Sequence, residues 1–80
     1  MKILKFYTPT CMPCKVIGKM LEQLENVDIE EVNATEELDK VDEYNVCSTP
    51  TLVFLDDSGK EVARTLGMTT LSNIKALLER

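Results

Sequence analysis

The chain has 80 residues, of which 44% are hydrophobic, and it carries a formal net charge of −5 at neutral pH. A chain of this length has room for one small core, so we expect a single domain over residues 1–80. The acidic balance argues against nucleic-acid and anionic-membrane partners, because both would require a basic surface.

No apolar run approaches membrane-spanning length, and residues 1–6 contain no long apolar signal core. The three cysteines are an odd set, and their spacing is unlike that of a disulfide framework. We therefore expect the reducing environment of the cytoplasm.

The chain opens with a pattern typical of a β-strand followed by a helix. Residues 3–8 are apolar and rich in strand formers, which predicts a buried central strand that ends at Pro9 and Thr10. From residue 11 or 12 to about residue 25 the period is helical, and Pro13 falls in the first turn, where its missing N–H costs nothing. The apolar face of this helix is expected to contain Val16, Ile17, Met20, Leu21 and Leu24.

The rest of the chain predicts three more strands and two more helices. The strands are expected over residues 27–32, 51–55 and 60–65. A short helix before the second of them would place Leu38, Val41 and Tyr44 on one side. Thr69 or Thr70 would cap a last helix, whose sheet-facing side chains would be Leu71, Ile74, Leu77 and Leu78.

The predicted order of elements is β-α-β-α-β-β-α. A strand–helix–strand passage implies a parallel crossover, whereas Asp56-Asp57-Ser58-Gly59 supplies a hairpin turn before an antiparallel strand. That turn lacks the spaced carboxylates of an EF-hand calcium loop. The fold class is therefore α/β, a four-stranded mixed sheet with helices on both faces.

The segment Cys11-Met12-Pro13-Cys14 lies where the strand pattern changes into the helix pattern. Two thiols at this spacing face each other across the first turn, where unpaired N–H groups and the helix dipole stabilise a thiolate. Such a pair can attack a disulfide and then close on itself. A structural bridge and a metal site are the alternatives; without histidine, Cys11, Cys14 and Cys47 could still form a three-thiolate site for a soft ion.

Together these residues resemble the thioredoxin superfamily. Residues 6–15 resemble the strand–Cys-x-x-Cys–helix opening of glutaredoxins and small thioredoxins. Ser48-Thr49-Pro50-Thr51 is similar to the loop before the third strand, where the family carries a cis-proline, and Gly67 matches the glycine before the last helix. The resemblance covers essentially the whole chain, in the minimal thioredoxin fold that lacks the extra N-terminal strand and helix of full-length thioredoxins.

The resemblance implies a thiol–disulfide oxidoreductase, mainly a protein-disulfide reductant. Cys11 would attack as the thiolate, and the more buried Cys14 would resolve the mixed disulfide. Lys15 adds a nearby positive charge. The dithiol needs no bound cofactor, so no cofactor or metal is expected.

Substrate binding is expected at the same place. Met12 and Pro13 stand at the rim between the cysteines and should tune the redox poise. A cis Pro50 would expose the backbone of Thr49 to an extended substrate strand, whereas the alternative for Pro50 is an ordinary proline at the edge of a strand.

The implied partners are protein disulfides, with ribonucleotide reductase as a client by family resemblance only. A flavoprotein disulfide reductase is the expected electron donor, and a monomer is expected. The glutaredoxin determinants for glutathione include Gly-Gly and an acidic residue, where this chain has Gly67-Met68-Thr69-Thr70. Glutathione-dependent activity and a non-catalytic binding module stay open as alternatives.

Two positions depart from the thioredoxin pattern below the motif. Lys5 stands where thioredoxins carry a buried Asp, and Glu31 aligns with the Lys that faces it. The ion pair could be kept with its charges exchanged, so that Glu31 accepts the proton of Cys14 and Lys5 stabilises thiolate. Alternatively, Lys5 reaches solvent along its aliphatic stem and Glu31 lies on an exposed edge.

Two further departures lie beside the motif. Thr10 replaces the Trp that thioredoxins place before the first cysteine. Cys47, three residues before Pro50, could form a disulfide with a partner or trap an oxidised Cys11; the alternative is a small apolar filler in the core.

Overall fold

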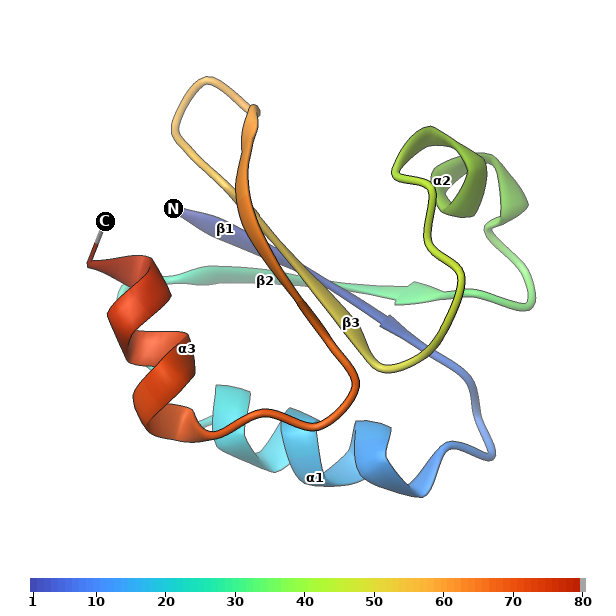
Figure 1. Ribbon diagram of the computed structural model, residues 1–80, viewed down its shortest axis with the longest axis horizontal. Helices are drawn as coiled ribbons and strands as arrows, with labels where there is room; N and C mark the ends of the chain where they lie inside the picture. The colour runs from blue at the N-terminus through green and yellow to red at the C-terminus, as the bar shows by residue number, and fades with distance from the viewer. Residues whose placement is uncertain (80) are drawn as a thin grey trace.

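The computed structural model describes residues 1–79 and has the element order predicted from the sequence. Figure 1 shows the arrangement of these elements. Their bounds are β1 Lys2–Tyr7, α1 Met12–Leu21, β2 Asp28–Asn33, α2 Leu38–Glu43, β3 Thr51–Leu55, β4 Glu61–Leu66 and α3 Leu71–Leu78. Strand β3 has the predicted bounds, and the other strands differ from the prediction by one residue at each end, which is the usual uncertainty of an element boundary.

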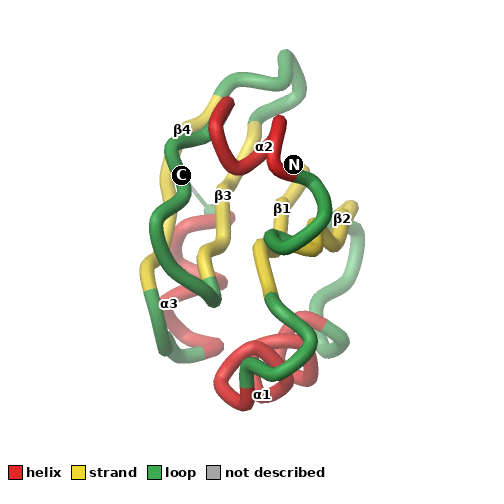
Figure 2. Tube along the Cα trace, turned by 90° about the vertical axis from the view of Figure 1, so that its right-hand side faces the viewer, coloured by secondary structure: helices red, strands yellow, loops and turns green. Residues whose placement is uncertain are grey.

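The sheet has the strand order β2-β1-β3-β4. Strand β1 is parallel to β2 and antiparallel to β3, and β3 is antiparallel to β4. The two central strands are therefore β1, as predicted from its apolar residues, and β3. Helices α1 and α3 cover one face of this mixed sheet and α2 covers the other (Figures 1 and 2).

The core has two clusters of buried side chains, one on each face of the sheet. Successive residues of β1 alternate between them, because neighbouring side chains of a strand point to opposite faces. The cluster under α1 and α3 contains Ile3, Ile17, Leu21, Leu52, Phe54 and Ile74. The cluster under α2 contains Leu4, Phe6, Val32, Val46, Val53 and Leu55, with Val41 and Tyr44 against it.

Helix α1 is shorter than predicted and buries a narrower face. It ends at Leu21 because the chain tightens into turns in which the Leu24 N–H donates to the Leu21 carbonyl at 3.1 Å. The Leu24 side chain still packs against the core. Val16 is 46% exposed, which corrects the predicted face, because the buried stripe follows Cys14, Ile17 and Leu21 at helical spacing.

Leu38, which the sequence groups with Val41 and Tyr44 on one side of α2, is 62% exposed. Helix α2 has less than two turns. Its contacts with the core come from Val41, in its second half, and from Tyr44, directly after its end. The Tyr44 ring meets the Phe6 ring edge to face, with 6.0 Å between their centroids.

Two local signals in the sequence are confirmed. The Asp56 carboxylate accepts hydrogen bonds from the Ser58 and Lys60 N–H groups and closes the hairpin turn, and the Ser58 hydroxyl bond is the main cause that lowers the Asp56 pKa. Thr70 is the N-cap of α3, where its hydroxyl accepts from the Asn73 N–H at 3.1 Å.

Ion pairs lie on the two edge strands of the sheet face that α2 covers only in part. Glu30 on β2 forms ion pairs with both Lys2 and Lys40. The hydrogen bond from Lys2 is the largest of the causes that lower the Glu30 pKa. On β4, Arg64 forms a bidentate pair with Glu61, with its Nε 2.6 Å from Oε2, and donates to the Tyr44 carbonyl at 2.8 Å. Arg64 thus joins the outer strand to the end of α2.

We predict that Leu4→Ala and Leu38→Ala, the same change at two leucines, differ strongly in stability. Leu4 is 2% exposed, and its truncation should lower the free energy of unfolding by about 2–5 kcal/mol because it leaves a cavity. Leu38→Ala should change it by less than about 0.5 kcal/mol. Urea unfolding of both variants measures this, and equal losses would contradict the assigned packing of α2.

The Glu61–Arg64 pair predicts a pH dependence of stability. The hydrogen bond from Arg64 lowers the Glu61 pKa in the folded chain below its usual 4.5, so the pair stabilises fully above that pH and less as pH falls through the lower folded value. Glu61→Gln should therefore cost up to about 1 kcal/mol at pH 7 and progressively less in acid. Glu43→Gln, at an exposed glutamate outside any ion pair of the described residues, is the control for unfolding measured from pH 7 to 3.

Candidate active site

Cys11 and Cys14 stand where α1 begins, and they are joined by a disulfide with 5.2 Å between their Cα atoms. Cys11 is the N-cap of the helix, and its Sγ accepts a hydrogen bond from the Cys14 N–H at 3.1 Å. The Cys11 N–H donates to the Thr8 carbonyl at 3.1 Å, which ties the motif to the end of β1. A sulfur at an N-cap lies beside the unpaired N–H groups of the first turn, where negative charge is favoured.

The two cysteines differ in burial. Cys11 is half-buried, whereas Cys14 is 2% exposed beneath the first turn of the helix. Met12 and Pro13 between them are exposed. As expected from the sequence, a molecule that approaches from solvent meets the Cys11 side of the disulfide first.

The loop before β3 lies beside the motif, and its Thr49–Pro50 peptide bond is cis. Phe6 and Thr51 form the last pair between β1 and β3, so the loops that carry Cys11 and Pro50 leave the same end of the sheet. Pro50 is buried and precedes a central strand, and its cis bond distinguishes it from an ordinary proline at the edge of a strand. Its carbonyl accepts from the Gly67 N–H at 2.9 Å.

Gly67 places a third loop against the same site. Its φ of 74° lies in the left-handed region, which favours glycine. The neighbouring Leu66 and Met68 side chains are exposed and, with Met12, provide apolar surface on segments that meet at this end of the molecule. The sequence reasoning did not single out Leu66 and Met68, although both flank the glycine that it did.

Lys5 and Glu31 form an ion pair, with 3.3 Å between Nζ and Oε1, but their burial is unequal. The Lys5 side chain is 9% exposed and the Glu31 side chain is 60% exposed on the edge strand β2. The ion pair with exchanged charges, one of the two alternatives, is therefore present. Lys5 does not reach solvent, whereas Glu31 does lie on an exposed edge, so each of the two interpretations is right in part.

Two residues around Lys5 were not foreseen. The Lys5 Nζ lies 5.3 Å from the centre of the Tyr7 ring and 2.8 Å from the position that a Cβ at Gly18 would occupy. A glycine inside a helical pattern was the available signal, since such a residue commonly marks a close approach.

Cys47 is exposed, so its interpretation as a core filler is wrong. It lines a hollow of about 290 Å³ together with Thr8 and Thr49, next to the loops of the motif. Among residues 1–79, no three Cys, His, Asp or Glu side chains come together as a metal site. Cys47 therefore does not form such a group with the two bonded cysteines.

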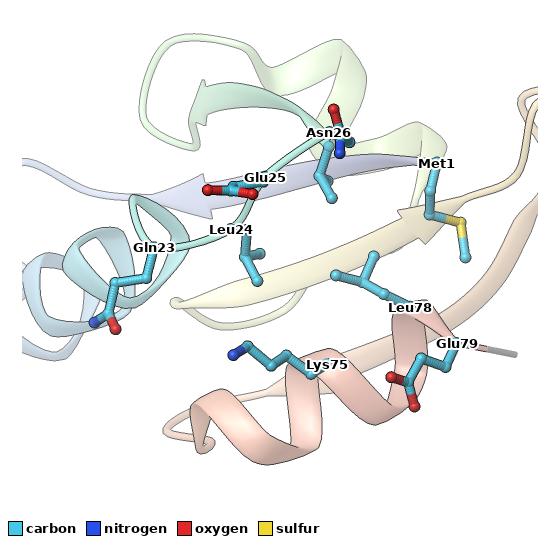
Figure 3. Close-up of a pocket in the computed structure, with 9 residues that line it drawn as sticks. Met1, Gln23, Leu24, Glu25, Asn26, Lys75, Leu78 and Glu79 are labelled. Atoms are coloured by element: carbon cyan, nitrogen blue, oxygen red, sulfur yellow. The ribbon is translucent and has the colours of Figure 1, made fainter.

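A further hollow of about 510 Å³ lies between the segment after α1 and the end of α3 (Figure 3). It is lined by Met1, Gln23, Leu24, Glu25, Asn26, Val27, Lys75, Leu78 and Glu79. It contains no cysteine and is separate from the motif. In the part of the chain that the structure describes, no helix has the length and apolar character needed to cross a membrane.

Comparison with known proteins is consistent with this geometry. The family model described as Thioredoxin matches residues 1–80. The chain belongs to the thioredoxin family. It is 36% identical over 67 residues to the SPbeta prophage-derived thioredoxin-like protein YosR of Bacillus subtilis (84% of this chain, 82% of that protein), and 33% identical over 82 residues to a Chlamydia caviae thioredoxin (98% and 79%).

Solved thioredoxin structures also resemble the fold. A mutant thioredoxin from Halobacterium salinarum has a TM-score of 0.89 at 25% identity, over 98% of this chain and 71% of that one. Thioredoxin 1 from Thermosipho africanus has a TM-score of 0.82 at 25% identity, over 99% and 91%. With the Cys11–Cys14 pair at disulfide distance, the protein is a thiol–disulfide oxidoreductase, and family membership implies protein disulfides as its substrates.

We predict that Cys47 is the thiol that reacts with a thiol-specific reagent in the oxidised protein. An aromatic disulfide reagent at neutral pH should react with one thiol per chain without denaturant, because Cys47 is exposed while the other two sulfurs are bonded. Cys47→Ser should remove the reaction completely. A reaction that appears only after denaturation would mean that Cys47 is buried.

Proposed function

We propose that residues 1–80 act as a single thioredoxin-like domain that reduces protein disulfides through the Cys11/Cys14 dithiol. The observation that carries this proposal is the unequal placement of the two sulfurs. The half-buried Cys11 is the N-cap of α1, and the buried Cys14 stands one turn behind it. One sulfur can meet a large substrate, and the other is within bonding reach of the first.

In the first step, the Cys11 thiolate attacks one sulfur of a substrate disulfide. The substrate S–S bond breaks, a bond forms between Cys11 Sγ and that sulfur, and the other substrate sulfur leaves as a thiolate that takes a proton from water. The N–H groups at the start of α1 and the charge of Lys15 favour the attacking anion.

In the second step, Cys14 loses its proton and attacks Cys11 Sγ. The mixed disulfide breaks, the Cys11–Cys14 bond forms, and the second substrate sulfur leaves as a thiolate and is protonated. Two electrons have passed from the dithiol to the substrate. Glu31, whose carboxylate is held by an ion pair with Lys5, is a candidate for the group that accepts the Cys14 proton.

The substrate would bind across the three loops at this end of the sheet. An extended segment can form backbone hydrogen bonds with Thr49, in front of the buried Pro50. Met12 and Pro13 are exposed beside the disulfide and would contact the substrate on the opposite side. Leu66 and Met68 extend the same apolar surface.

The oxidised pair must be reduced again by a two-electron donor. We propose the dithiol of a flavoprotein disulfide reductase, because Gly67-Met68-Thr69-Thr70 lacks the residues with which glutaredoxins hold glutathione. Two glutathione thiols are the alternative donor. The setting we propose is a monomer in the cytoplasm, and ribonucleotide reductase is a candidate client through family resemblance.

The test is reduction of insulin with dithiothreitol as the final reductant. The wild-type protein should accelerate the reaction, and Cys11→Ser should lower the rate to that of dithiothreitol alone because no attacking thiolate is left. Cys14→Ser should also lose turnover but retain a covalent complex with the substrate. Cys47→Ser is the matched control and should keep the wild-type rate.

A wild-type rate no greater than that of the reductant alone would favour a non-catalytic binding module instead. The donor is decided separately by supplying NADPH with a thioredoxin reductase, or NADPH with glutathione and glutathione reductase. Turnover with the second system alone would replace the proposed donor by glutathione. Clients can be identified as the proteins held by Cys14→Ser.

A further inference from the structure

We propose that the buried ammonium of Lys5, seated against Gly18, stabilises the thiolates of the dithiol and so makes the Cys11–Cys14 disulfide more oxidising. This inference rests on the proposed function, since it concerns the same cysteines. Lys5 stands where thioredoxins carry a buried Asp, and this difference in charge should shift the redox equilibrium of the cysteines in a definite direction.

The first step is where Lys5 places its charge. Lys5 belongs to the central strand β1, and its side chain, 9% exposed, runs between the sheet and α1. Its Nζ lies 2.8 Å from the position of a Cβ at Gly18, so a side chain larger than hydrogen would displace it. Glycine costs a helix about 1 kcal/mol relative to alanine, and here it provides the space for the ammonium.

The second step is the position of Gly18, against which this charge lies, relative to the two cysteines on α1. Gly18 follows Cys14 by four residues, so the two positions lie on the same side of α1 about 5–6 Å apart. Cys14 is almost fully buried, and a charge near a buried group is screened much less than one in water. Lys5 therefore acts on the Cys14 sulfur across about one helical turn, and on Cys11 just beyond it.

The third step concerns the other charges around Lys5. On the sheet, the residues level with Lys5 on β3 and β4 are the uncharged Leu52 and Thr65. Glu31 opposes the Lys5 charge, but its carboxylate is mostly in water, so it cancels the field only in part. Tyr7 is the other titratable group in contact, and the groove of about 590 Å³ beside Lys5 is also lined by Lys15 and Lys19 of α1 and by its C-cap, Glu22.

The consequence for the redox equilibrium has a definite sign. A nearby cation stabilises thiolate, whereas the disulfide has no charge to stabilise, so Lys5 favours the reduced protein. In exchange with glutathione, the disulfide takes two electrons from two glutathione thiols, giving the Cys11/Cys14 dithiol and one glutathione disulfide. Lys5 should shift this equilibrium toward the dithiol, which makes the protein a weaker reductant than it would be with a neutral residue.

The experiment uses the full chain with Cys47→Ser, so that the exposed third thiol does not react. In this background, Lys5→Met keeps the apolar stem and removes the charge. We expect it to raise the apparent pKa of the Cys11 thiol, read from the pH profile of alkylation, by about half a unit to one unit. The glutathione equilibrium constant should shift about threefold toward the disulfide.

Two further variants separate electrostatics from folding. Gly18→Ala should displace the ammonium while keeping or raising helix stability, so its alkylation profile should move in the same direction as that of Lys5→Met. Glu31→Gln removes the opposing charge and should move the profile the other way, to lower pH. Lys19→Met, an equal change of charge at an exposed position of α1, is the control and should leave the profile nearly unchanged.

Superimposable profiles for Lys5→Met and Lys19→Met would overturn the proposal. So would a shift of Glu31→Gln in the same direction as Lys5→Met, because removing the carboxylate that opposes Lys5 should favour thiolate. If Lys5→Met does not fold, Gly18→Ala and Glu31→Gln give the same decision by the signs of their shifts. Absence of insulin reduction by the wild-type chain would refute the proposed function itself, which is a separate result.

Discussion

The position of the first helix on the sheet is the constraint on which the site depends. Strand β1 ends at Tyr7 and α1 begins at Met12, so the chain has only a short loop in which to turn back. Ile17 and Leu21 then bury the helix against Ile3, Leu52 and Phe54 of the central strands. Because this packing fixes the axis of α1, it also fixes where its N-terminal N–H groups point, and Cys11 lies at that end.

The same packing gives the two cysteines unequal surroundings. The buried stripe of α1 begins with Cys14, and Cys11 stands just outside the helix as its N-cap. Helical geometry therefore produces one accessible and one protected sulfur without any further element. The loop with the cis Pro50 precedes β3, and Gly67 follows β4. The hydrogen bond between Pro50 and Gly67 joins the two loops at this end of the molecule.

Helix α2 lies alone on one face of the sheet, and ion pairs lie on the edge strands of that face. Glu30 with its two lysines and Arg64 with Glu61 lie on the two edge strands of that face. Long side chains of this kind cover apolar surface with their stems while keeping their charged ends in water. The other face has two helices (Figure 2). It contains the one nearly buried cation of the described residues, Lys5, against Gly18 of the helix that carries the cysteines.

Local sequence signals determined most of the architecture and the identity of the motif. The strand β3, the hairpin turn at Asp56 and the cap at Thr70 depend on neighbouring residues only, so they could be predicted without knowing the fold. The Cys-x-x-Cys at a strand–helix boundary is equally local. Together with the Thr49–Pro50 sequence, it was enough to indicate the family and the chemistry.

Only the tertiary structure decided which side chains were buried and what they faced. Val16 and Leu38 fit an apolar pattern yet lie in solvent, and Cys47 is exposed although free cysteines are commonly buried, because burial depends on which elements meet. The Lys5–Glu31 pair needed the register of β1 with β2, and the contact of Lys5 with Gly18 needed the height of α1 above the sheet. These are relations between residues far apart in the chain, which periodicity and spacing do not encode.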